Sequence, residues 1–595
     1  MNALDALANL GALSAIDIAL GRLIAEKSRE EGRADDGALV GLAAALASAA
    51  LAAGHSCLPL ASAPAFVAAR LPDENTLPAL PTPEAWRAAL RASALVAPDA
   101  QTPAALVLDA HDRVYLRRYY VYERTVAARL RERLDVARDF PPIAALDPDD
   151  ADPDQRIATA LAQHSRLLVI TGGPGSGKTT TVLRLLAAIT AQHAAAGLSA
   201  PRIALAAPTG KAAARLSESL RDRPLAPAGL PGATTLHRLL GAMPGRSRPR
   251  HDRANVLPFD LVVVDEASML DLALAARLCD ALAPETRLVL LGDRDQLAAV
   301  EAGSVFGALC AAVPEPNRYA APLAAWLARA AGVKVEKAAA PPPLANALVE
   351  LRGNHRFGAA GAIGRFAQAI RRGDAAAAAT VAAESEAIRI EPFASGARIA
   401  IQRVIAQRHA LADLATDPAA AVAAASRFRA LCALREGPAG SLALNDAVER
   451  ELRRRAGVAG DAWFAGRQIL IVANDHRLGL FNGDTGVALA TGQGGALEVW
   501  FRDATGRLRA LPPPLLPAHE SAFALTVHKA QGSEFDEVLI VLGDRDARVL
   551  SRELLYTAVT RARHKVEVWT SEDVLAATLA RATVRWSGLA DALAV

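Results

Sequence analysis

Short apolar runs alternate with longer amphipathic stretches along most of the chain after residue 150. Four of these runs predict strands, because each is followed by a stretch with helical periodicity: Leu167–Ile170, Ile203–Ala207, Leu261–Val264 and Leu288–Leu291. A second set of predicted strands comprises Phe428–Leu434, Phe523–Val527, Val538–Leu542 and Val566–Trp569. Strands that alternate with helices form parallel sheets covered by helices, so the pattern predicts an α/β fold in two halves.

The segments outside these two sets have other patterns. Residues 1–145 predict mostly helix, and the acidic, Pro-containing stretch Asp147–Asp154 indicates a boundary after them. The Pro/Ala-rich stretch Ala338–Pro343 predicts a linker or loop between the halves. Between residues 462 and 518, short β-like runs with Asn-Gly, Thr-Gly and Gly-Gly turns predict a small inserted β-domain. We therefore expect three parts, with the boundaries 1–145, 146–345 and 346–595.

Composition narrows the class of protein. With 66 Lys+Arg against 63 Asp+Glu, the net charge of +3 is compatible with nucleic-acid binding but does not by itself indicate it. The four cysteines are scattered without a C-x-x-C pair, which argues against a disulfide framework and a structural zinc site. The segment Met1–Gly21 lacks the basic region of a secretory signal. The uncharged run Gly37–Gly54 is mostly Ala and Gly, so it predicts a buried helix rather than a membrane span. We expect a cytoplasmic protein.

A Walker A loop follows the first predicted strand and opens a predicted helix. Its glycines let backbone N–H groups surround phosphates, and the helix N-terminus adds partial positive charge. Lys178 is expected to reach the β- and γ-phosphates of ATP, and the Thr179 hydroxyl to ligate Mg²⁺. The residues expected to bind the nucleotide here are Gly172, Gly173, Pro174, Gly175, Ser176, Gly177, Lys178, Thr179 and Thr180.

An acidic pair ends the predicted strand Leu261–Val264. Asp265 is expected to hold the metal, directly or through water, and Glu266 to orient or deprotonate the attacking water. Taken alone, such a pair is more often an exposed strand end, but the Walker A loop favours the catalytic interpretation. These two motifs specify a nucleoside triphosphatase, and kinases, GTPases and transporters stay open at this point.

Four further polar clusters follow predicted strands or begin helices, where ligands lie in open α/β sheets. They are Ala207–Leu216, Gly292–Gly307, Thr526–Phe535 and Tyr556–Arg563. Together the motifs resemble the ordered set of superfamily 1 helicases and, more closely, the RecD family, the alpha subunits of exodeoxyribonuclease V. The resemblance covers Gln155–Trp569 and reaches the N-terminal part through Gly54–Leu60 and Tyr115–Val126.

The resemblance implies a fold and a set of roles. The fold is two RecA-like P-loop NTPase domains that enclose ATP, with a helical N-terminal, partner-binding domain and a small inserted β-barrel of Src-homology-3 type. Gln155 would contact adenine, Gln296 would sense the γ-phosphate, and Glu534 would lie near the ribose or the γ-phosphate. Arg356 and Arg561 would act as arginine fingers from the second domain. An arginine supplied by another domain makes hydrolysis depend on closure, which suits a motor.

The resemblance also implies contacts with single-stranded DNA. Thr209, Lys211, His237, Thr526 and His528 fall on motifs that line the DNA track in the family, although Thr or His at a strand end often only caps a turn. The basic run Arg246–Arg253 lies in an expected hairpin insertion near residues 242–258, and its alternative is a solvated loop. The segment Val114–Thr125 mixes aromatic residues with arginines, which suits base stacking or a helix that attaches this domain to the next.

The function implied is an ATP-dependent 5′→3′ translocase and helicase on single-stranded DNA at duplex ends. It would work with RecB-like and RecC-like subunits in a RecBCD heterotrimer, in double-strand break repair by homologous recombination and in the degradation of linear DNA. A stand-alone RecD-like helicase is the alternative, although residues 1–145 show no paired G-x-G hairpin signal. A motor-inactive assembly subunit is a third. None of the seven lysines has an acidic residue two positions earlier, so we expect no nuclease site of the Asp/Glu-x-Lys kind.

Overall fold

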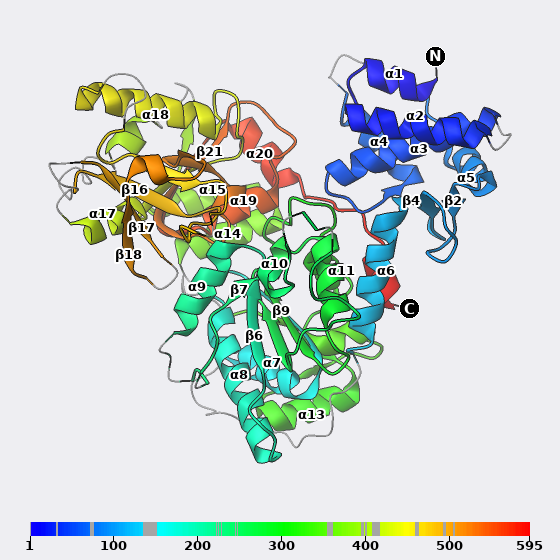
Figure 1. Cartoon of the computed structure of the whole chain (residues 1–595), viewed down its shortest axis with the longest axis horizontal. Helices are drawn as coiled ribbons and strands as arrows, with labels where there is room; N and C mark the ends of the chain where they lie inside the picture. The colour runs from blue at the N-terminus through cyan, green and yellow to red at the C-terminus, as the bar shows by residue number, and fades with distance from the viewer. Residues whose placement is uncertain are drawn as a thin grey trace.

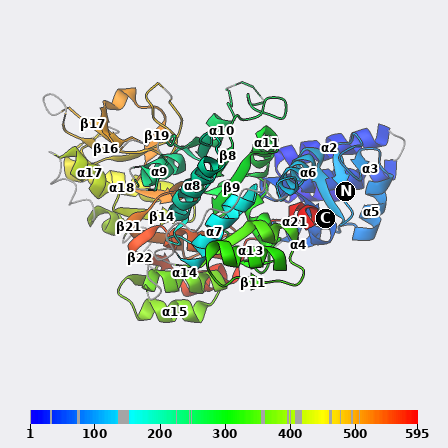
Figure 2. The same cartoon turned by 90° about the horizontal axis from the view of Figure 1, so that it is seen from below.

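A computed structural model describes the chain except for residues 1, 31–33, 72–76, 135–151, 222, 224, 228, 244, 247, 354–360, 394–397, 399, 400, 407–416, 459–462, 476, 492–495, 504, 505 and 595. In two perpendicular views, a central sheet lies between the N-terminal helices on one side and an inserted sheet on the other (Figures 1 and 2). The N-terminal helices and the inserted sheet therefore lie on opposite sides of the central sheet.

The N-terminal part packs helices on a small sheet. The sheet has the strand order β1-β4-β3-β2, formed by β1 (Leu58–Pro59), β4 (Arg113–Leu116), β3 (Leu106–Leu108) and β2 (Val96–Ala97). The uncharged run lies in α3 (Ala34–Ala52), which is buried from Val40 to Ala47 as predicted. Small residues bring α3 against α2 (Ala15–Glu30), since a Cβ on Gly41 would lie 2.5 Å from the Gly21 carbonyl oxygen. Within the described residues, no helix is both long enough and apolar enough to span a bilayer.

A six-stranded parallel sheet forms the centre of the molecule. Its order is β12-β5-β9-β8-β6-β7, formed by β12 (Leu348–Leu351), β5 (Leu167–Gly172), β9 (Arg287–Gly292), β8 (Leu261–Val264), β6 (Ile203–Ala207) and β7 (Thr234–Thr235). Among the surrounding helices are α7 (Pro153–His164), α8 (Lys178–Ala195), α9 (Gly210–Leu220), α11 (Leu272–Ala281), α12 (Val305–Ala311) and α13 (Ala321–Ala331). Leu167 and Val169 enter the core on one face and Leu168 and Ile170 enter it on the other. Burial on both faces explains why β5 is a continuous apolar run.

The first sheet continues past the expected boundary at residue 345. Because β12 pairs in parallel with β5, residues Leu348–Leu351 belong to this sheet. The stretch before it also stays here: β11 (Glu336–Lys337) pairs with β10 (Arg318–Tyr319), and Leu344 and Ala347 are buried in the core of this part. The Pro/Ala-rich stretch is therefore a loop within the first half and does not join the two halves.

A second parallel sheet has five strands. Its order is β13-β22-β21-β14-β20, formed by β13 (Ile388–Pro392), β22 (Ala562–Thr570), β21 (Phe535–Gly543), β14 (Phe428–Cys432) and β20 (Ala524–Thr526). Helices of this half are α14 (Ala362–Arg372), α15 (Ala375–Ala383), α17 (Pro418–Ala425), α18 (Ser441–Ala456), α19 (Arg552–Val559) and α20 (Glu572–Ala580). The two predicted sets of strands thus form the two parallel sheets, and the α/β prediction is confirmed.

An antiparallel sheet is inserted between β14 and β20. Its order is β18-β17-β16-β15-β19, formed by β18 (Leu508–Leu511), β17 (Glu498–Arg502), β16 (Thr485–Leu489), β15 (Gln468–Ile471) and β19 (His519–Ser521). In the described part of the chain, no pairing joins the edge strands β18 and β19. The predicted inserted β-domain is present, but its strands form an open sheet where we expected a closed barrel.

The C-terminal segment leaves the second sheet and returns to the N-terminal part. Arg581, directly after α20, still pairs with Asp546 of the second half, with 2.6 Å between Arg581 Nη2 and Asp546 Oδ2. Five residues on, the ring of Trp586 stacks on His55 with 4.0 Å between centroids. The final helix α21 (Leu589–Ala594) lies against α6 (Arg117–Arg131), which itself packs on the first sheet (Figure 1).

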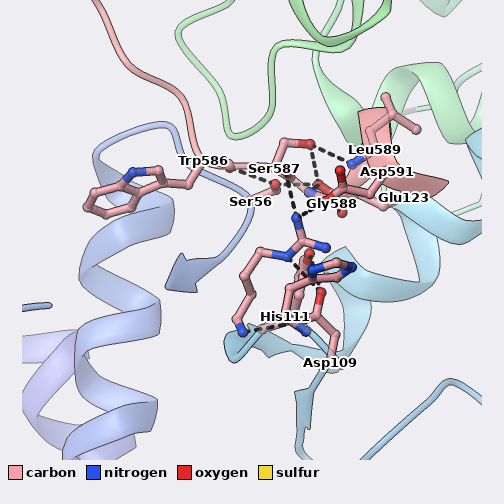
Figure 3. Close-up of polar contacts among 11 residues, drawn as sticks. Ser56, Asp109, His111, Glu123, Trp586, Ser587, Gly588, Leu589 and Asp591 are labelled. Carbon is pink, nitrogen blue, oxygen red and sulfur yellow. Dashed lines mark hydrogen bonds and ion pairs between the residues drawn. The ribbon is translucent and has the colours of Figure 1, made fainter. Parts of the chain in front are cut away.

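A buried carboxylate fixes the end of this segment. Glu123 of α6 is 2% exposed. It accepts hydrogen bonds from the Ser56 hydroxyl (2.5 Å), the Ser587 hydroxyl (2.6 Å) and the Gly588 N–H (3.0 Å), which converge on it in Figure 3. Hydrogen bonds of this kind offset the cost of burying a polar group, while burial raises the pKa of Glu123. The amphipathic helix after Val114 therefore attaches the N-terminal part to the rest of the chain, and this favours the plainer of its two predicted interpretations.

Candidate nucleotide site and nucleic-acid track

The Walker A loop connects β5 to α8 at the carboxyl edge of the first sheet. Gly175 (φ +79°) and Gly177 (φ +87°) adopt the left-handed conformation that favours glycine, which turns the loop around its own backbone N–H groups. Lys178 Nζ lies inside the loop and donates to the carbonyl oxygens of Gly172 (2.5 Å) and Gly173 (3.1 Å). The buried Ser176 hydroxyl has no hydrogen-bond partner among the described residues. This geometry suits a phosphate, and we call residues 172–179, with the one unpartnered hydroxyl of Ser176, the phosphate cradle.

The acidic pair follows β8 at the same edge. Burial and the neighbouring Glu266 carboxylate raise the pKa of Asp265 to about 6, and the charges of Lys178 and Arg215 oppose this rise. The Glu266 N–H donates to Asp265 Oδ1 at 2.9 Å, and Glu266 itself has φ +52°, a left-handed conformation that strains a non-glycine residue. The Walker A lysine and the acidic pair therefore lie within each other's electrostatic reach, as the motifs predict.

The segment after β9 is bound by the second half of the chain. Asp293 is 1% exposed and its Oδ2 accepts from Gln296 Nε2 (3.0 Å) and from the Tyr556 hydroxyl of α19 (3.1 Å). The Leu297 N–H donates to Thr557 Oγ1 at 2.8 Å, and the Leu297 carbonyl accepts from a glutamine of the second half. Gln296, the expected γ-phosphate sensor, therefore lies at the junction between the two halves.

Charged side chains cross the same junction. Glu534 pairs with Arg215 of the first half and with Arg563 of its own half, with 3.1 Å between Glu534 Oε2 and Arg563 Nη2. Arg561 is 3% exposed, and its Nε donates to the Thr557 carbonyl at 3.1 Å. Burial and Arg561 lower the pKa of Arg215, while Glu266 and Asp265 raise it. Arg561, Glu534 and the acidic pair are thereby brought together around Arg215, a residue for which we predicted no role.

Four other residues are expected to contribute to the nucleotide site. Gln155 lies in the first turn of α7 and is buried, and its carbonyl accepts from Thr159 Oγ1 at 2.8 Å. Thr179 and Thr180 lie in the first turn of α8, and Thr180 is exposed. Arg356 falls outside the described residues. The roles expected for these four residues, like those of the other expected nucleotide-site residues, stay predictions.

A cavity of about 880 Å³ runs between the first sheet, the second half and the inserted sheet. Thr209, Lys211 and His237, three of the five expected DNA contacts, line it. They share it with Phe481 and Asp484 of the inserted sheet. The structure therefore brings three of the expected DNA contacts to one cavity, which the first half, the second half and the inserted sheet enclose.

Thr526 and His528 are not among the residues that line this cavity. Thr526 Oγ1 accepts from the Lys529 N–H at 3.4 Å, which is the local capping that was the plainer interpretation of this threonine. Burial and the charge of Arg585 in the C-terminal segment lower the pKa of His528. These two residues therefore do not line the cavity with the other three expected contacts, and their role in DNA binding stays a prediction.

The basic run around residue 250 forms a short exposed loop. The Arg250 N–H donates to the Gly241 carbonyl at 3.1 Å, and Asp252 forms an isolated bridge with Asn255. In its described residues this loop contains no longer strand pairing, so its expected role as a hairpin pin stays a prediction.

Arg429 of β14 lines the cavity and is a residue for which we predicted no role. It is 3% exposed and ties three elements together: Nη1 donates to Gln468 of β15 at 2.8 Å, and Nη2 donates to the Ala425 carbonyl of α17 at 3.2 Å. Its guanidinium also lies 5.3 Å above the Phe535 ring. The signal available in the sequence was a single charge within an apolar strand.

Lys211 lines the same cavity, within electrostatic reach of this arginine. Burial and the charge of Arg429 lower the pKa of Lys211 to about 8, and Asp484 is the carboxylate that opposes this. An anionic phosphate would stabilise the ammonium form and raise its pKa again. Two neighbouring cations that line one cavity therefore favour a polyanionic ligand.

This arrangement predicts that binding of single-stranded DNA depends on pH. Binding to the ammonium form takes up a proton once the pH exceeds the pKa of about 8 in the free protein. We expect the affinity for an oligo-dT probe to fall about tenfold from pH 7 to pH 9. Fluorescence anisotropy at constant ionic strength measures it. Lys211→Arg keeps its charge over this range, so its affinity for oligo-dT should not depend on pH. An unchanged pH dependence in that variant would contradict the attribution of the effect to Lys211.

Three family models match the chain. The model described as RecBCD enzyme subunit RecD, N-terminal domain, matches residues 9–115. The AAA domain model matches residues 155–302, and the UvrD-like helicase C-terminal domain model matches residues 521–568. The matches fall on the N-terminal part, on the sheet with the Walker A loop, and on the last strands of the second sheet.

The chain is also similar to curated relatives. It is 42% identical over 576 residues to RecBCD enzyme subunit RecD of Mycobacterium tuberculosis (strain ATCC 25618 / H37Rv), covering 92% of this chain and 90% of the relative. It is 36% identical over 472 residues to RecBCD enzyme subunit RecD of Haemophilus influenzae, covering 73% and 71%. It is 30% identical over 467 residues to the ATP-dependent RecD2 DNA helicase of Deinococcus radiodurans, covering 76% of this chain and 54% of that protein.

Proposed function

Because the chain belongs to the RecD family, we propose that it is the ATP-dependent motor subunit of a RecBCD-type complex, a DNA helicase that moves 5′→3′ along single-stranded DNA. The observation that carries this proposal is the junction between the two parallel sheets. There the Walker A loop and acidic pair of one half lie with Arg561 and Glu534 of the other. A nucleotide site shared by two bodies converts hydrolysis into relative movement.

The residues present fit ATP with Mg²⁺. The left-handed Gly175 and Gly177 and the unpartnered Ser176 hydroxyl suit a triphosphate. Thr179 and Asp265 would hold the metal, and the raised pKa of Asp265 beside a second carboxylate suits a divalent cation. When bound, Mg²⁺ neutralises charge on the transferred phosphoryl group.

Each catalytic side chain then has a defined task. Lys178 stabilises the phosphate oxygens, and Glu266 orients the attacking water and accepts its proton. Arg561 adds a positive charge from the second half, and Gln296 reports the state of the γ-phosphate. Asp293, Leu297 and Arg215 all bind the second half, so a change in the bound nucleotide would act on contacts that hold the two halves together.

The cavity beside this junction supports the role of DNA as the second ligand. Thr209, Lys211 and His237 offer a hydroxyl, an ammonium and an imidazole, which contact phosphates without reading sequence. We assign the inserted sheet, through Phe481 and Asp484, to the same track, as the counterpart of the family's barrel. The basic loop near Arg250 would separate strands ahead of it.

We divide the motor differently from the sequence-based boundaries. The first motor domain runs through β12, and the second begins with α14. The N-terminal part up to residue 145 would bind the RecB-like and RecC-like subunits. The match to the Mycobacterium RecD covers nearly all of both chains, which supports a complex subunit over a stand-alone helicase such as RecD2.

Tailed duplexes test the function and its polarity. We expect the full chain, purified with its partner subunits, to unwind a 5′-tailed duplex at least about tenfold faster than a 3′-tailed one when its own ATP site drives movement. In a complex that holds a second motor, that motor is inactivated so that only this chain drives movement. Fluorescence release of the labelled strand reports the rate.

Two variants complete this test. Lys178→Gln should stop the 5′-tail unwinding, whereas Lys27→Gln, which changes an exposed lysine paired with Glu30, should not. A preference for the 3′ tail would contradict the polarity. Unwinding that survives Lys178→Gln would contradict the assignment of the ATP site.

A further inference from the structure

One carboxylate oxygen at the junction holds two side chains. Asp293 Oδ2 accepts from Gln296 Nε2 at 3.0 Å and from the Tyr556 hydroxyl at 3.1 Å. Gln296 comes from the first half, and Tyr556 comes from α19 of the second. All three side chains are buried, since their exposures are 1%, 7% and 6% for Asp293, Gln296 and Tyr556. A shared acceptor in a dry environment couples the positions of its two donors.

The Tyr556 hydroxyl also lies against the Walker A loop. A Cβ built on Gly173 would be only 3.1 Å from the hydroxyl oxygen, so the ring reaches across the junction to the phosphate cradle. Burial and the carboxylates of Asp293 and Asp295 raise the pKa of Tyr556 well above its usual value, so the hydroxyl keeps its proton and donates. The tyrosine therefore contacts both the cradle and the residue that holds Gln296.

Two other hydrogen bonds across the junction bind only the backbone of Leu297. Thr557 and Gln531 bind the backbone N–H and carbonyl of Leu297, and they fix the path of the loop. Tyr556 binds the carboxylate that in turn holds the Gln296 amide. Movement of α19 away from β9 would break this hydrogen bond and leave the Asp293 carboxylate with one fewer donor.

We propose that Tyr556 is a positioning residue for ATP hydrolysis: its hydroxyl fixes Asp293 in the orientation that holds Gln296 beside the γ-phosphate, so that Gln296 is set only when the second half is docked. This inference rests on the proposed ATP-driven motor. Through Tyr556, docking of the second half would set the position of Gln296 in the first half.

The test is Tyr556→Phe in the full chain with its partner subunits, which removes one hydroxyl at nearly constant volume. Loss of this hydrogen bond to a charged group, which is made only in the docked state, should lower kcat for DNA-stimulated ATP hydrolysis about tenfold to a hundredfold. The KM for ATP and the Kd for oligo-dT should stay within about twofold, because neither ligand is bound by this hydroxyl. Asp293→Asn, which changes the other end of the same hydrogen bond, should give the same kcat-only loss.

A double-mutant cycle separates positioning from a general structural role. In a Gln296→Ala background, Tyr556→Phe should cause no further loss, because the side chain that it positions is gone. Tyr122→Phe, a matched change on α6 away from both sites, should leave kcat unchanged. Thermal unfolding of every variant checks that the fold is kept.

The outcomes distinguish this inference from the proposed function. An additive loss in the Gln296→Ala background, a rise in KM without a fall in kcat, or wild-type turnover by Tyr556→Phe would each overturn the positioning role. Absence of DNA-stimulated ATP hydrolysis in the wild-type complex would instead overturn the proposed function.

Discussion

Arg561→Ala is expected to lower the rate of DNA-stimulated ATP hydrolysis about 10³-fold to 10⁵-fold, the range for removal of an arginine finger. The side chain is 3% exposed and is held by carbonyls of its own half, with 3.1 Å from Nε to Thr557 and 3.4 Å from Nη1 to Ser533. It is therefore already oriented, and no ordering is needed when the halves close. Single-turnover hydrolysis of radiolabelled ATP measures the chemical step directly.

Two companion variants define what Arg561 supplies. Arg561→Lys keeps a positive charge but cannot make both backbone contacts, so its rate should lie between those of the wild type and Arg561→Ala. Arg581→Ala removes another arginine of the same half, one that pairs with Asp546 at the surface, and should hydrolyse ATP normally. If Arg561→Ala weakened ATP binding enough to account for the lost rate, the residue would be a binding group and the arginine-finger role would fail.

The strands and the Walker A loop could be predicted from the sequence because their signals are local. Residues Leu167–Ile170 face two cores and are all apolar, and the loop after them has its glycines at fixed spacing. The place of β12 could not be predicted in the same way. Leu348 pairs with Val169 across about 180 residues of sequence, and parallel pairing leaves no turn signal between partners.

The inserted sheet shows the same limit in another form. Turn-forming pairs such as Asn482–Gly483 predict that strands follow one another, which is what β15 to β19 do. Closure into a barrel depends on whether the first and last edges meet, and nothing local encodes that contact. The expectation of a barrel came from the family resemblance, and the described pairing does not close.

Partners of buried charges were also beyond the sequence. Arg429 could be seen only as one charge in an apolar strand, whereas its partners Gln468 and Ala425 come from different elements. Arg215 was visible in a motif, but its pairing with Glu534 joins residues more than 300 positions apart. The sequence indicates which side chains carry chemistry, and the fold decides which of them meet.

Glu266→Gly is expected to slow hydrolysis and at the same time to stabilise the fold. Loss of the water-orienting carboxylate should slow hydrolysis about 10²-fold to 10⁴-fold. Glu266 has φ +52°, and relief of a strained left-handed conformation contributes about 1 kcal/mol, which raises the Tm of a domain of this size by roughly 2–4 °C. Single-turnover hydrolysis and differential scanning calorimetry measure the two effects.

The matched control is Glu266→Ala, which removes the same carboxylate and the same repulsion with Asp265 but keeps a Cβ. Both variants should lose hydrolysis equally, and only the glycine variant should gain the stability that comes from the backbone. The difference between their Tm values therefore isolates the strain at this residue from the charge that it carries. Equal Tm values would show that φ +52° costs nothing here, and hydrolysis in Glu266→Ala would remove Glu266 from catalysis. If both effects are found, the chain holds its catalytic carboxylate in place at the expense of stability, because a strained turn after β8 places it beside Asp265 and near Arg215.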